Sequence, residues 1–132
     1  MELFPKDMGN LSLEGIGGKI AYYKEQLQLY HWQTQSYAEH KTLDEMITNV
    51  KSLGDDIVEK VMGYSNRRIK NFKIEPINNY NTGCCINIAN DIIRFSVQLK
   101  SFANENNMLD VGNLADALSG IGAKYKYLFT LK

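Results

Sequence analysis

Apolar side chains recur every three or four residues along four long segments of this 132-residue chain. Such spacing places each stripe on one face of an α-helix, whereas a strand would need alternation at every second residue. We therefore expect an all-α domain over residues 1–132, with helices at about 13–32, 37–62, 84–104 and 109–130. The four stripes are Ile16, Ile20, Tyr23, Leu27 and Tyr30; Leu43, Ile47, Val50, Gly54, Ile57 and Val61; Ile88, Ile92, Phe95, Leu99 and Phe102; and Leu114, Leu118, Ile121, Tyr125 and Leu128.

The connections between these helices differ in length. Short polar breaks separate the first helix from the second and the third from the fourth. Ser36 and Glu39 have the spacing of a capping box at the start of the second helix. Residues 63–83, in contrast, contain Pro76 and several asparagines and show no sustained period. One long connection between two short ones predicts a ferritin-like four-helix bundle, with a crossover between helices two and three.

The composition limits the classes of partner. Hydrophobic residues make up 44% of the chain and charged residues 23%, as in a globular domain. The formal net charge is zero, which argues against a general attraction to nucleic acid or to an anionic membrane. No segment is apolar enough to span a bilayer, and the start, MELFPKDMGN, lacks the features of a secretory leader. We expect a cytoplasmic protein, in the host cytoplasm if the chain is viral.

The two cysteines, Cys84 and Cys85, are neighbours in the sequence. Adjacent cysteines rarely have the geometry of a good disulfide. Neither has a histidine at zinc-finger spacing. They are therefore predicted to be free thiols that pack in the third helix, in a reducing compartment.

Four side chains suggest metal chemistry. His31 and His40 are the only histidines, and Asp55 and Glu59 lie four residues apart on the predicted second helix. Imidazole and carboxylate together suit iron or manganese. At 100° per residue, these groups fall about 60° to 160° from the apolar stripes, on the flank of the bundle. A site inside the bundle would need a Glu-x-x-His pair, which this chain lacks, so a shared site between two subunits remains. The alternative is that the polar stripe is only a solvated face.

Several short motifs resemble the Dps branch of the ferritin superfamily. They are Leu29-Tyr30-His31-Trp32, Glu39-His40, Leu43-Asp44-Glu45 and Asp55-Asp56-Ile57-Val58-Glu59-Lys60. Their order resembles that of the family, as does the interval of 15 residues between His40 and Asp55. The likeness is strongest over residues 20–63. The nine-residue link between the histidines is shorter than in the family, and no lysine-rich tail is present.

The resemblance implies ferroxidase chemistry at sites shared by a twofold dimer. His31 and His40 of one subunit would provide imidazoles and Asp55 of the other a carboxylate, with Glu59 bridging two irons. Trp32 would lie near the metal as an electron-donating ring, and Asp44 would be an auxiliary acid. The implied function is iron binding, Fe(II) oxidation and oxidative protection by a homodimer or a larger cage, with another divalent metal left open. The alternatives are a ferritin-like structural or interaction dimer without catalysis, such as a viral accessory protein, and a DNA-binding protein.

Overall fold

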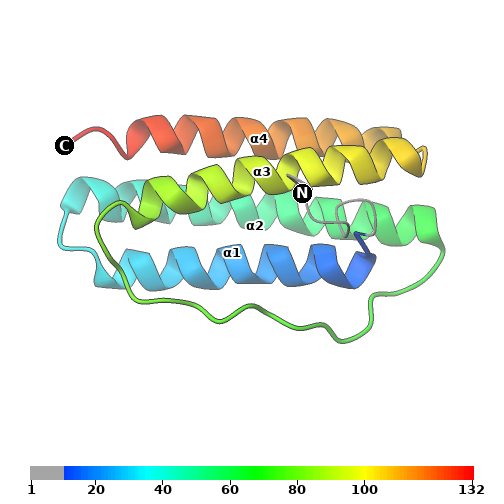
Figure 1. The fold of residues 1–132 in the computed structure, drawn as a ribbon, viewed down its shortest axis with the longest axis horizontal. Coiled ribbons are helices and arrows are strands. Elements are labelled where there is room, and N and C mark those ends of the chain that lie inside the picture. Colours follow the sequence, from blue (N-terminus) through cyan, green and yellow to red (C-terminus); the bar gives the residue numbers. More distant parts are fainter. Residues whose placement is uncertain (1–10) are drawn as a thin grey trace, which may run out of the picture.

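The computed structural model describes residues 11–132, and this range contains four helices and no strand (Figure 1). The helices are α1 (Leu13–Gln33), α2 (Tyr37–Ser65), α3 (Cys84–Glu105) and α4 (Leu109–Leu128). The all-α prediction and the order of the helices are confirmed. Residues 1–10, on which the leader prediction rested, lie outside the described range. Within residues 11–132, no helix combines the length and apolar character that crossing a bilayer requires.

The helices form two antiparallel hairpins, α1–α2 and α3–α4, which pack side by side as a four-helix bundle (Figure 1). Residues 66–83 run along the length of α1 and return the chain to the end where α2 began (Figure 1). Consequently α2 and α3 run in the same direction, as the prediction of a long crossover requires. The main contact between the hairpins is that of α2 with α4.

The predicted stripes of α1, α2 and α3 form most of the core. In α4 the stripe is displaced, because Leu114, Ile121 and Leu128 are only half-buried. The buried positions of that helix are instead Val111, Gly112, Ala115, Leu118, Gly122 and Tyr125. A Cβ at Gly122 would lie 2.7 Å from Ile93 Cγ1. Close packing of α4 on α3 therefore requires small residues at the contact, and a pattern of large apolar residues does not predict these positions.

Two helix ends differ from the sequence prediction by more than one residue. α2 continues past Gly63, which is an exposed residue within the helix. The helix ends at Ser65, and its C-cap, Asn66, has a left-handed φ of 55°. α4 ends at Leu128, two residues earlier than predicted.

Side chains of α1 fasten the crossover to the bundle. Gln26 is fully buried, donates from Nε2 to the Asn78 carbonyl (2.8 Å) and accepts from the Asn78 N–H (2.7 Å). Glu14 accepts a hydrogen bond from Lys70 N (3.0 Å) near the beginning of the crossover. Gly18 lies close to the crossover backbone, because a Cβ there would lie 2.5 Å from the Lys73 carbonyl oxygen. The glycines near the start of α1 thus make room for the crossover.

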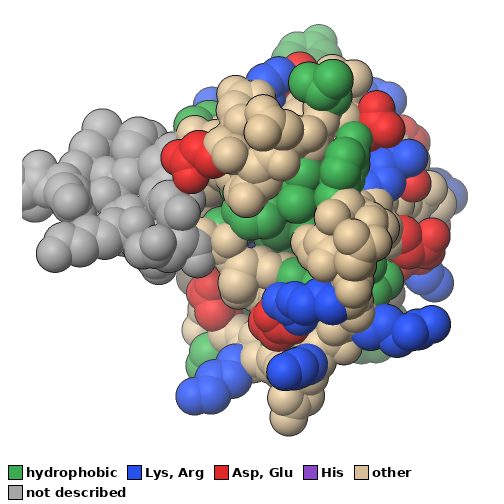
Figure 2. Space-filling view, turned by 90° about the vertical axis from the view of Figure 1, so that its right-hand side faces the viewer, with side chains coloured by type: hydrophobic (Ala, Val, Ile, Leu, Met, Phe, Trp, Pro, Cys, Tyr) green, Lys and Arg blue, Asp and Glu red, His purple; other side chains and the backbone are tan. Residues whose placement is uncertain are grey.

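Figure 2 shows the end of the bundle where α1 begins and α2 ends. Hydrophobic side chains gather at the centre of this end, and lysine, arginine and acidic side chains surround them (Figure 2). Both histidines belong to the opposite end, where α1 passes into α2 (Figure 1). The two ends of the α1–α2 hairpin therefore differ in chemistry.

Candidate metal centre

His31 and His40 lie against each other across the turn between α1 and α2. Their rings stack with centroids 3.9 Å apart and planes inclined by 16°. His31 Nδ1 lies 3.0 Å from the His40 carbonyl oxygen, and His40 Nδ1 lies 3.0 Å from the His31 carbonyl oxygen. The nine-residue link between them is therefore long enough to bring the imidazoles into direct contact.

The paired hydrogen bonds fix the tautomer of both rings. A carbonyl oxygen can only accept, so each neutral ring carries its hydrogen on Nδ1 and leaves a lone pair on Nε2. This is the arrangement found in metal-binding histidines, whose other nitrogen usually donates to a carbonyl or a carboxylate. Because the ring planes are nearly parallel, the two in-plane lone pairs do not converge on one point. The geometry suits one ion per ring better than one ion held by both.

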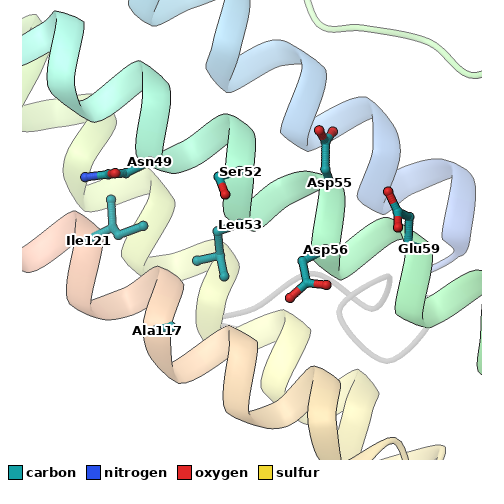
Figure 3. A pocket seen from close by; sticks show the side chains of 8 residues that line it. All are labelled: Asn49, Ser52, Leu53, Asp55, Asp56, Glu59, Ala117 and Ile121. Carbon is teal, nitrogen blue, oxygen red and sulfur yellow. The ribbon is translucent and has the colours of Figure 1, made fainter.

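The acid pair lies further along α2. Asp55 and Glu59 are exposed and extend toward the α1 side of the helix, whereas Asp56 points away from it (Figure 3). Both also border a groove of about 270 Å³ between α1, α2 and the start of the crossover, with an apolar floor that includes Ile20 and Val58. Carboxylates that meet solvent beside an apolar floor are free to accept a cation or a partner surface.

The structure does not bring the histidines and the acids together within one chain. Fifteen residues of helix separate His40 from Asp55, which corresponds to about 22 Å along α2. Among residues 11–132, no three His, Cys, Asp or Glu side chains are grouped closely enough to hold a metal ion. One protomer therefore presents two separate half-sets of ligands on its α1–α2 hairpin.

The other predicted site residues lie on the surface. Trp32 is 71% exposed at the end of α1, beside the histidine pair in sequence. Tyr37, which was not a predicted site residue, is 75% exposed at the start of α2. Asp44 is exposed one turn after His40. Exposed aromatic rings of this size commonly mark contact surfaces.

One feature of this region was missed from the sequence. Lys24 borders the groove that contains Asp55 and Glu59, where it adds a positive charge beside two negative ones. Its seven-residue spacing from His31, two helical turns, could have identified it.

The capping box was only half right. Ser36 Oγ accepts from Glu39 N (3.1 Å), but the Glu39 carboxylate does not return to the Ser36 N–H. It accepts instead from Thr34 Oγ1 (2.6 Å) and from the Tyr80 hydroxyl. The hydrogen bond to Glu39, aided by partial burial, raises the pKa of Tyr80 to about 12. Glu39 thus ties the turn that carries the histidines to the end of the crossover.

We compared the chain with protein families, with curated proteins and with solved structures, and only the first comparison gave a match. No curated protein matches the chain, and no solved structure matches it. A family profile covers residues 31–129, a range that starts at His31 and includes both histidines, both acids and α2 to α4. The chain belongs to that family, which is described as a family of unknown function (DUF5856).

Proposed function

We propose that this protein is a ferritin-like, Dps-type iron-binding protein that oxidises Fe(II) at sites shared between two copies of the chain. The observation that carries the proposal is the pair of reciprocal hydrogen bonds between His31 and His40. Those bonds hold two imidazoles in the tautomer that leaves Nε2 free for a metal. A crossover that lets α2 and α3 run in the same direction supports the ferritin-like assignment of the bundle.

A twofold dimer completes the ligand set. The histidines and the acids belong to the same α1–α2 hairpin but are about 22 Å apart along α2. An axis across this hairpin, near Ile47 midway between His40 and Asp55, would bring each histidine pair to the acids of the partner subunit. Two equivalent sites would result, each with imidazoles from one chain and carboxylates from the other.

The residues suit ferrous iron as a substrate. Nitrogen and oxygen ligands bind Fe(II), and a site with few protein ligands leaves positions for an oxidant. Each ferrous ion gives up one electron to dissolved dioxygen or peroxide, and Asp55 and Glu59 then favour the ferric product because of its higher charge. Trp32, next to His31 in sequence, would act as an electron donor if a reactive oxidant remains.

Aerobic addition of Fe(II) to the metal-free protein tests the proposal, with ferric absorbance as the readout. The wild type should oxidise Fe(II) faster than buffer, and His31→Ala and Glu59→Ala should each remove the acceleration. Asp56→Asn is the matched control, because this carboxylate is also exposed on α2 but points away from α1 (Figure 3). Oxidation at the buffer rate by a folded wild-type dimer would favour a structural dimer without catalysis.

A further inference from the structure

A second group of metal-binding atoms lies at the start of α3, at the same end of the bundle as the histidines but formed by other residues. Cys84 and Cys85 are the first two residues of this helix, and both are free and buried. Their Sγ atoms are 3.9 Å apart. Side chains of successive helical residues usually diverge, so two sulfurs this close are unusual.

The sulfur separation suits a bridging ion better than a disulfide. Adjacent Cα atoms are about 3.8 Å apart, less than the roughly 4.4–6.8 Å typical of disulfides, so oxidation would require the backbone to move. An ion at about 2.3 Å from both sulfurs would subtend an angle of about 116° at the present separation of 3.9 Å. That angle is close to tetrahedral, and the ion could be held without moving either sulfur.

One of the two thiols, that of Cys84, borders a cavity, whereas Cys85 is only 2% exposed. Cys84 lines a cavity of about 350 Å³ between α1, the crossover and α3, which also includes Tyr30, Asn81 and Asp91. The N-cap of α3 is Gly83, which provides no side chain to cap the helix. The Cys84 N–H donates to the Asn81 carbonyl oxygen (3.1 Å), and the positive end of the helix dipole favours negative charge, including that of thiolates.

From this geometry we infer that Cys84 and Cys85 form a two-thiol site for a thiophilic ion of the zinc or cadmium type. Binding of M²⁺ by the two thiols forms two metal–sulfur bonds and releases two protons, with no change of oxidation state. Water or a small anion in the cavity completes the coordination. The site does not depend on iron oxidation or on dimer formation.

Both thiols are buried and free, so an entering ion must displace their protons.

The test is a titration of the reduced, chelator-treated full chain with Cd²⁺. We expect a thiolate-to-cadmium absorption band that saturates at one ion per chain, and release of two protons per ion. Cys84→Ser and Cys85→Ser should each lose the saturating band. The variant His31→Ala/His40→Ala should keep it, which separates this site from the proposed iron site.

A second measurement covers the case in which a cysteine variant fails to fold. In the wild type, bound Cd²⁺ should protect both thiols from alkylation, as read by mass spectrometry. Absence of a saturating band in the folded wild type would overturn the inference. Retention of the band in Cys84→Ala/Cys85→Ala, or equal alkylation with and without Cd²⁺, would overturn it as well.

Discussion

Replacement of Gln26 by methionine should release part of the crossover without creating a cavity. Methionine has a similar volume and fits the buried position, but it cannot reproduce the two hydrogen bonds to the Asn78 backbone, at 2.8 and 2.7 Å. Each bond contributes about 1 kcal/mol net, so Gln26→Met should lower the free energy of unfolding by about 2 kcal/mol.

Urea denaturation followed by circular dichroism measures this loss. At a slope of about 2 kcal/mol per molar urea, the midpoint should fall by about 1 M. Gln33→Met is the matched control, because Gln33 makes a similar pair of bonds, to Asn79 Oδ1 and Tyr80 N, from a less buried position. Water can replace these bonds more easily, so Gln33→Met should lower the free energy of unfolding by less than about 1 kcal/mol.

Amide hydrogen exchange locates the effect. Exchange should increase within residues 74–80 in Gln26→Met, while the middle of α3 keeps its protection. Equal losses of stability in the two variants would refute the argument from burial. An unchanged exchange rate in the crossover would refute the claim that Gln26 fastens it.

Three further predictions concern the surface and the crossover. Trp32 is the only tryptophan in the chain and is 71% exposed. If the α1–α2 face dimerises, its fluorescence emission should shift to the blue as the protein concentration rises. A constant emission spectrum would contradict dimerisation through this face. Gly18→Ala should destabilise the protein by about 1–3 kcal/mol in thermal or urea unfolding, because its Cβ would overlap a carbonyl of the crossover. Gly63→Ala, which has no neighbour within 4 Å, should instead stabilise the protein by about 1 kcal/mol. The opposite order of stabilities would contradict this account of the packing. The hydrogen bond from Arg67 lowers the pKa of Glu14 to about 2 from an ordinary 4.5. This contact therefore stabilises the fold above pH 4.5, and the stabilisation is lost as the pH falls toward 2. In Arg67→Gln the titration midpoint of the Glu14 carboxyl, measured by NMR, should rise, and an unchanged midpoint would exclude the contact.

The four helices could be predicted from the sequence because their cores follow one strong period. All five stripe positions of α1 are buried, and in α2 only Ile47 is not fully buried. The predicted stripe is wrong in α4, where the helices pack too closely for large side chains. In α4, Ala115 and Gly122 lie at the centre of the buried face, whereas the larger Leu114 and Ile121 lie at its edge.

Polar fastening of the crossover could not be predicted from the sequence. Gln26 is the fully buried polar residue of α1, yet its neighbours in sequence give no sign of a partner 52 residues away. The same holds for Glu39, whose position suggested a local capping box but whose carboxylate meets Tyr80. Long-range hydrogen bonds depend on the path of an irregular segment, which no periodicity encodes.

For the candidate site, the sequence indicated the residue types and the flank on which they lie, but not the contact between the rings. Asp44, Asp55 and Glu59 are exposed and the histidines half-buried, in agreement with the flank positions. The stacking of His31 on His40 depends on how sharply the chain turns between α1 and α2. The sharing of ligands between subunits stays a prediction.

Mixing two inactive variants tests the shared site most directly. One variant lacks both histidines (His31→Ala/His40→Ala), and the other lacks both acids (Asp55→Asn/Glu59→Gln). A mixed dimer would have one complete site, formed by the histidines of the acid variant and the acids of the histidine variant. After unfolding and joint refolding at equal amounts, Fe(II) oxidation should recover to about a quarter of the wild-type rate, because half of the dimers are mixed and each has one of two sites. A refolded mixture that forms dimers but is no more active than either variant alone would contradict the account.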